Sequence, residues 1–184
     1  MNNHQIGKIL SSSRTTKNCF QGVYSLDQIE RKTLGSNSGI VLNLSKTNQP
    51  GTHWVSLFQP IGGYMEYFDS FAMGPEVKQE IVDFLPEKFN FNRKRLQSAF
   101  NTTCGQYCIY YIYKKSLGNS LQSILDEFGD NYKENDFRVN RQVENIFNVD
   151  LEVSDTDFLV EQIAKEPTNF LAEFGLENLL DNHP

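Results

Sequence analysis

Short apolar runs separated by turn residues dominate the middle of the chain. Residues 39–46 (GIVLNLSK) alternate apolar and polar positions and are rich in β-branched side chains, which predicts a strand that ends at the breaker NQPG. Residues 52–60 (THWVSLFQP) and 64–71 (YMEYFDSF) have the same character and flank IGG, whose glycines suit a tight turn with positive φ. The pattern predicts a β-hairpin, and residues 93–100 (RKRLQSAF) predict a further strand.

Other segments carry apolar residues at helical spacing. Residues 74–85 (GPEVKQEIVDFL) place three apolar side chains on one face, after a proline suited to a first helical turn. Residues 104–118 (CGQYCIYYIYKKSLG) predict a longer helix with two lysines in its last turn and a terminal glycine. Further helices are predicted at residues 4–12, 119–128 and 135–147. This mixture of helices and strands predicts an α+β fold.

The composition suits one globular domain with an appendage. The chain has 184 residues, of which 39% are hydrophobic and 12% aromatic. This is enough for one sizeable core, but the chain is short for two independent domains. Residues 1–148 carry 16 Lys and Arg against 14 Asp and Glu, whereas residues 149–184 carry one Lys against nine acids. We predict a domain over 1–148 and an acidic helical extension over 149–184, which docks on the domain, binds a partner or extends the core.

Several classes of protein are excluded by what the chain lacks. No run approaches the roughly 18 apolar residues that span a bilayer, and the first residues, MNNHQIGKIL, lack the apolar core of a signal peptide. We therefore expect a soluble, intracellular protein. Three cysteines are an odd number and indicate free thiols. With only three histidines, two of them near the chain ends, neither a four-ligand zinc site nor another cofactor is expected.

The segment FNTTCGQYCIYYIYKK contains two cysteines four residues apart. Cys104 lies where an Asn- and Thr-rich loop enters a predicted helix, whose free N–H groups and positive end stabilise a thiolate. Gly105 would let a substrate backbone approach closely. Cys108 lies one turn further along, where an apolar thiol packs into a core. Taken alone, Cys104 would be a buried structural thiol, so its role as a nucleophile depends on its partners.

A thiol nucleophile needs a base and a group that orients the base. His53 and Asp69 lie on the two strands of the predicted hairpin and are expected to be neighbours. Gln97, seven residues before Cys104, supplies an amide N–H for the oxyanion of a tetrahedral intermediate. Each has an ordinary structural alternative: an exposed strand histidine, a capping carboxylate, a surface glutamine. Together they predict a Cys-His-Asp triad with a Gln oxyanion hole.

The order of HW, FDS, Gln and CGxxC resembles the adenain-type cysteine proteases of adenoviruses and their relatives, within the ubiquitin-like-protein-specific protease fold. The similarity extends over KNCFQGVYSLDQI, GIVLNLSK, PGTHWVSLF and NDFRVNRQVENIF, and so over residues 5–148. Size and Asn-rich composition look like those of proteases from virophages, Maverick or Polinton elements and adintovirus-like genomes. The resemblance implies a papain-like fold with a central mixed sheet flanked by helices.

The resemblance also implies roles for single residues. It makes Cys104 the nucleophile, His53 the general base and acid, Asp69 its orienting group and Gln97 the oxyanion donor. Trp54 matches the family position beside the histidine, where an indole walls a narrow channel that admits Gly-Gly; its alternative is a strand core residue. Such a channel implies cleavage of viral capsid or virion precursor proteins at small, glycine-containing sites.

Two features depart from the adenovirus enzyme. That enzyme is activated by a peptide joined to a cysteine shortly before the oxyanion glutamine, whereas EKFNFNRKRLQ contains no cysteine, so a peptide or protein activator would have to bind in another way. It is also basic and uses DNA as a cofactor, whereas a sequence pI near 5.1 argues against a nucleic-acid partner here. We expect a monomer without membrane contact, in the host cytoplasm or nucleus or packaged in a virion.

Two other functions remain open. An isopeptidase that removes ubiquitin-like modifiers would use the same triad, but such a partner needs an extended exosite and this body is short. A binding module could keep the fold without activity. It would have no chemical reason to retain Cys104, His53, Asp69 and Gln97 together.

Overall fold

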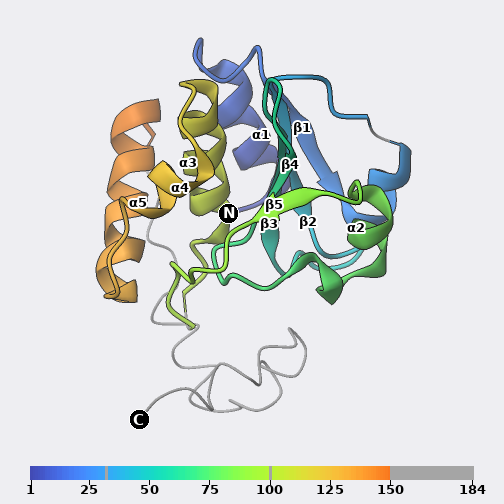
Figure 1. The fold of residues 1–184 in the computed structure, drawn as a ribbon. Coiled ribbons are helices and arrows are strands. Elements are labelled where there is room, and N and C mark those ends of the chain that lie inside the picture. Colours follow the sequence, from blue (N-terminus) through green and yellow to red (C-terminus); the bar gives the residue numbers. More distant parts are fainter. Residues whose placement is uncertain (32, 100, 150–184) are drawn as a thin grey trace, which may run out of the picture.

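The computed structural model describes residues 1–31, 33–99 and 101–149 (Figure 1). Its strands are β1 (Phe20–Ser25), β2 (Ser38–Asn43), β3 (Trp54–Gln59), β4 (Met65–Phe68) and β5 (Phe89–Phe91). Its α-helices are α1 (Asn3–Ser12), α2 (Gln79–Phe84), α3 (Cys104–Ser116), α4 (Leu121–Leu125) and α5 (Tyr132–Phe147). Two 3₁₀ helices, η1 (Leu26–Arg31) and η2 (Pro75–Val77), complete the described elements.

The five strands form one mixed sheet in the order β1-β2-β3-β4-β5. β3 pairs antiparallel with β2 and β4, whereas the outer strands β1 and β5 pair parallel with their neighbours. β3 and β4 are the predicted hairpin, with Ser56 opposite Phe68 and Gly62 at φ +65° in the turn. Because β3 and β4 run in opposite directions, the start of β3 and the end of β4 lie at the same end of the sheet. The expected α+β fold, with a central mixed sheet flanked by helices, is confirmed.

An apolar core on each face of the sheet holds the helices. Residues of α1, α3, α4 and α5 share one core, and residues of η1 and α2 share the other (Figure 1). α3 lies directly on β3, and Gly39 of β2 permits this close approach. A Cβ atom at Gly39 would lie 2.6 Å from Phe58 Cδ2 and 2.8 Å from Ile112 Cδ1 of α3, so a larger residue would push the helix off the sheet.

The predicted strand at residues 93–100 is wrong, since its described residues form a loop that follows β5. Leu96 and Gln97 both donate their backbone N–H groups to the carbonyl oxygen of Ser70, at 2.8 and 3.1 Å. Successive residues of a strand point their N–H groups to opposite sides, so two neighbours that share one acceptor cannot continue a ladder. Bonds to the segment after β4 thus replace strand pairing here.

Two further elements differ from the prediction. The expected helix at residues 74–85 is divided, because Lys78 has an extended backbone, with φ −141° and ψ 121°, between η2 and α2. β1 was not predicted, since Gly22, at φ +134°, interrupts its pattern of apolar residues. The helices predicted at residues 4–12, 104–118, 119–128 and 135–147 are present as α1, α3, α4 and α5.

The acidic extension predicted from residue 149 lies, apart from Val149, outside the described residues. α5 ends at Phe147, and Asn148 after it adopts a left-handed backbone with φ +50°. Within residues 1–31, 33–99 and 101–149, no helix is long and apolar enough to cross a membrane. The same residues contain no cluster of three or more His, Cys, Asp and Glu side chains that could hold a metal ion.

Candidate active site

Cys104 is the first residue of α3, where the sequence placed it. The residue before it, Thr103, makes no side-chain cap to the helix, so the first-turn N–H groups keep their donor capacity. These groups and the helix dipole favour a negative charge at the Cys104 sulfur. The side chain is buried, with 7% of the residue's surface exposed.

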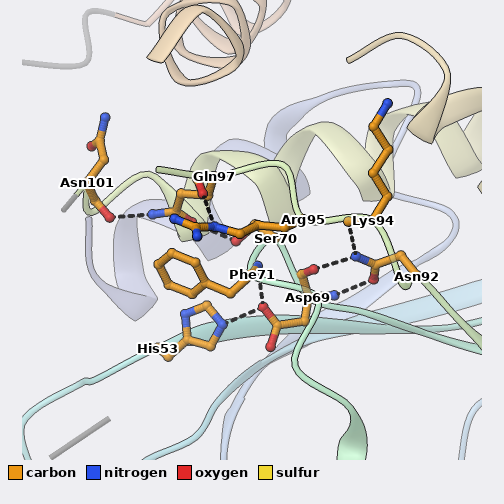
Figure 2. A network of polar contacts seen from close by, with 9 residues as sticks. All are labelled: His53, Asp69, Ser70, Phe71, Asn92, Lys94, Arg95, Gln97 and Asn101. Carbon is orange, nitrogen blue, oxygen red and sulfur yellow. Dashed lines mark hydrogen bonds and ion pairs between the residues drawn. The ribbon is translucent and has the colours of Figure 1, made fainter. Parts of the chain in front are cut away.

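His53 and Asp69 meet at the end of the sheet where β3 starts and β4 ends. His53 immediately precedes β3 and Asp69 immediately follows β4, so neither belongs to its strand, although the predicted neighbourhood is correct. His53 Nε2 and Asp69 Oδ1 are 2.8 Å apart, and both residues are buried (Figure 2). Since Asp69 takes Nε2, the second ring nitrogen, Nδ1, is left for another partner.

Cys104 lies close enough to the imidazole to affect its protonation. Burial opposes protonation of His53, but the charge and hydrogen bond of Asp69, together with those of Cys104, raise the pKa of His53 from 6.5 to about 10. Near neutral pH the ring is therefore an imidazolium, which stabilises a thiolate beside it. The structure thus brings together Cys104, His53 and Asp69.

The backbone around Asp69 is fixed by Asn92, a residue that the sequence analysis missed. Asn92 Oδ1 accepts the Asp69 N–H at 2.9 Å, and Asn92 Nδ2 donates to Asp69 O at 2.6 Å and to Lys94 O at 3.1 Å (Figure 2). The Phe71 N–H donates to Asp69 Oδ1 at 2.8 Å, beside the bond from His53. One asparagine after a strand gives no pattern that could have revealed this role.

Phe71 is a second residue that sequence reasoning missed. Its ring lies against the His53 imidazole, with centroids 5.0 Å apart and planes inclined by 34° (Figure 2). The Arg95 guanidinium lies 6.0 Å from the centroid of the Phe71 ring. This aromatic cover excludes water from the ion pair of His53 and Asp69, which strengthens their attraction.

Gln97 lies in the loop before α3 and is fully buried. Its Oε1 accepts the Ser70 hydroxyl at 2.6 Å, and its Nε2 donates to the carbonyl oxygen of Asn101 (Figure 2). An amide nitrogen carries two hydrogens, and this bond uses one of them. The role of the second hydrogen as an oxyanion donor remains a prediction.

The two residues assigned to substrate contact lie in the same region. Trp54, at the start of β3, is 6% exposed and packs in the core that also contains Cys104. A Cβ atom at Gly105 would lie 3.3 Å from both Met1 Sδ and Ile6 Cδ1, so the chain's own first residues contact this glycine. Roles of Trp54 and Gly105 in substrate binding remain predictions.

The other two cysteines are buried thiols. Cys108 lies one turn after Cys104 in the core, and burial raises its pKa well above the ordinary value. Burial also raises the pKa of Cys19. Neither shares the position of Cys104 beside an imidazolium, so Cys104 is the reactive thiol that this site supports.

Comparisons with known proteins give structural likeness only. No protein-family model and no curated protein matches the chain. Among solved structures, the chain is similar to two crystal structures of the ASFV pS273R protease. The selenomethionine form matches at 25% identity and TM-score 0.38, over 55% of this chain and 42% of the protease. The other matches at 20% identity and TM-score 0.47, over 75% of this chain and 65% of the protease.

A third similar structure is the central domain of the uncharacterized Lpg1148 protein from Legionella pneumophila, with 14% identity and TM-score 0.45 over 81% of this chain and 98% of that domain. In both protease comparisons the aligned part spans less than two thirds of the protease's own length. A functional assignment therefore depends on the side chains around Cys104.

Proposed function

We propose that the protein is a cysteine peptidase of the adenain type, with Cys104, His53 and Asp69 as its triad. The observation that carries the proposal is the position of His53. Its Nε2 bonds Asp69 Oδ1 at 2.8 Å, and the Cys104 thiol at the start of α3 is near enough to raise the pKa of His53. This supports a nucleophile, a base and an orienting group that neighbour one another in the order that nucleophilic catalysis requires.

The arrangement supports acyl transfer in two stages. In the resting ion pair the Cys104 proton is already on His53, and the thiolate attacks the scissile carbonyl carbon, whose oxygen becomes an oxyanion. The Cys104 backbone N–H and the second Gln97 Nε2 hydrogen stabilise that oxyanion. The imidazolium then protonates the leaving amine, and an acyl-thioester remains. His53 next takes a proton from water, the hydroxide attacks the thioester, and the thiol leaves with that proton.

The proposed substrates are viral capsid or virion precursor proteins cleaved at small, glycine-containing sites. Two observations support this class: the sequence motifs HW, FDS and CGxxC, and the burial of both reacting residues, with 3% of His53 and 7% of Cys104 exposed. Bulky side chains would clash beside such an enclosed thiol, whereas glycine fits. The likeness to proteases of virophages and Maverick or Polinton elements belongs to the same proposal.

Cleavage of glycine-rich capsid-precursor peptides, followed by mass spectrometry, tests the proposal. The wild-type protein should cleave them, the variant Cys104→Ala should not, and Cys108→Ala should retain the chemistry because Cys108 lies in the core. A parallel assay with a ubiquitin-like modifier joined to aminomethylcoumarin separates an isopeptidase from a precursor peptidase. Cleavage by neither route, with an intact fold, would leave only a binding module.

A further inference from the structure

Asp136 of α5 is a buried carboxylate close to the active site, with 2% of its surface exposed. It accepts five hydrogen bonds from the segment that leads from Gln97 into α3. Its Oδ2 accepts the N–H and the hydroxyl of Ser98 at 3.2 and 2.5 Å and Asn101 Nδ2 at 3.1 Å, while its Oδ1 accepts the hydroxyls of Thr103 and Tyr107 at 3.2 and 3.1 Å. The Asp136 carboxylate thus bonds residues before, at and after the start of α3.

These contacts reach Gln97 through a short relay. Asp136 Oδ2 holds the Asn101 side chain, and the carbonyl oxygen of Asn101 accepts the hydrogen bond from Gln97 Nε2. The Ser70 hydroxyl fixes the opposite end of the same amide at Oε1. The direction of the remaining Nε2 hydrogen therefore depends on where Asp136 places Asn101.

The same carboxylate also affects the start of α3. Thr103 stands at the cap position, where a threonine hydroxyl ordinarily accepts an N–H of the first turn. Its hydroxyl donates to Asp136 Oδ1 instead, and no side-chain cap forms. The Thr103 side chain consequently leaves the first-turn N–H groups near Cys104 able to donate to a thiolate or an oxyanion.

We propose that Asp136 is the positioning residue of the oxyanion hole, acting on Gln97 through Asn101 and on the start of α3 through Thr103. This inference rests on the proposed peptidase function. All five groups are donors, although the Tyr107 hydroxyl shares its one hydrogen between Asp136 Oδ1 and Leu96 O, and an ionised carboxylate is an acceptor at both oxygens. An amide of the same shape would turn an NH₂ group toward some of these donors, leave them unpaired and shift the loop.

The variant Asp136→Asn tests this role by steady-state kinetics. We expect kcat for peptide cleavage to fall by about 10²-fold with little change in KM, because a displaced oxyanion donor affects the transition state more than substrate binding. In a Gln97→Ala background the same substitution should cause a clearly smaller loss, since the donor that it positions is already gone and only the effect through Thr103 remains. Equal losses in both backgrounds would show that Asp136 does not act through Gln97 and would overturn the proposal.

Asn101→Ala is a second variant for the case in which Asp136→Asn fails to fold. It removes the bond from Asn101 Nδ2 but leaves the other four bonds of Asp136, and we expect kcat to fall by about 10-fold, the value of one hydrogen bond. An unchanged kcat would refute the relay. Glu66→Gln is the matched control, because Glu66 is also buried but bonds Tyr111 and Lys115 in the second half of α3, away from the start of that helix.

A second readout separates this inference from the peptidase proposal. Hydrogen exchange of the Gln97 side-chain amide, followed by NMR, requires no substrate. It should accelerate in Asp136→Asn and Asn101→Ala and stay unchanged in Glu66→Gln. If the wild-type protein cleaves nothing, the peptidase proposal fails while the exchange pattern still tests the relay. If the wild type cleaves and exchange at Gln97 is the same in all variants, the relay is wrong.

Discussion

The negative charge of Asp69 should decide whether His53 is protonated at neutral pH, and Asp69→Asn tests this directly. Asparagine keeps the shape of the side chain and an oxygen for the Phe71 N–H, which donates at 2.8 Å, but it lacks the charge. His53 then loses the attraction across the 2.8 Å contact while its burial, which disfavours the imidazolium, stays. The pKa of His53 should therefore fall.

The size of the fall follows from the pair itself. The pKa of His53 is raised from 6.5 to about 10, and at about 1.4 kcal/mol per pKa unit the surroundings favour the imidazolium by about 5 kcal/mol. Removing an opposite charge at contact distance lowers a pKa by about 1 to 3 units, or about 1.4 to 4 kcal/mol. The effect of Cys104 on His53 remains in the variant. The pKa of His53 should therefore drop by about 1 to 3 units.

NMR titration of the His53 imidazole measures this change, with the resonance assigned by its loss in His53→Gln. Peptide cleavage in Asp69→Asn should fall by about 10² to 10⁴-fold, because the ring loses both its charge partner and its fixed orientation. Glu66→Gln is the control, since it removes another buried carboxylate, paired with Lys115, and should leave His53 unchanged. An unaltered pKa of His53 in Asp69→Asn would refute the electrostatic reasoning.

Three other outcomes are expected. Iodoacetamide near neutral pH should alkylate Cys104 before Cys19 or Cys108, since burial raises the pKa of both other thiols. If mass spectrometry finds Cys19 or Cys108 modified at the point where activity is lost, Cys104 is not the nucleophile. His53→Ala should lower kcat by several powers of ten and Gln97→Ala by about 10²- to 10³-fold, and an unchanged kcat in the latter would exclude its oxyanion role. Because folding raises the pKa of His53 to about 10, its contribution to stability is complete below pH 6.5 and disappears as the pH rises through 10. Urea unfolding at pH 6 and pH 10 should show this loss in the wild type and not in His53→Gln.

The order of residues along the chain was enough to predict the components of the site. Strand periodicity and the IGG turn identified the hairpin that brings His53 to Asp69, and the loop-to-helix transition identified Cys104. These signals are local, because a turn and a helix start are determined by a few neighbouring residues. For the same reason, the α+β class could be predicted from the alternation of patterns.

Only the tertiary structure decided what surrounds those components. Asn92 and Phe71 act on Asp69 and His53 from positions that have no distinctive sequence pattern, and the loop at residues 93–99 was mistaken for a strand. Asp136 lies more than thirty residues after the loop it organises, on a helix whose pattern shows only an amphipathic surface. Hydrogen bonds between such distant residues need the sheet and α5 to be packed together. A local sequence pattern therefore does not predict them. The sequence by itself therefore determined which residues are candidates for the chemistry, while packing decided the surroundings of His53 and the placement of Gln97.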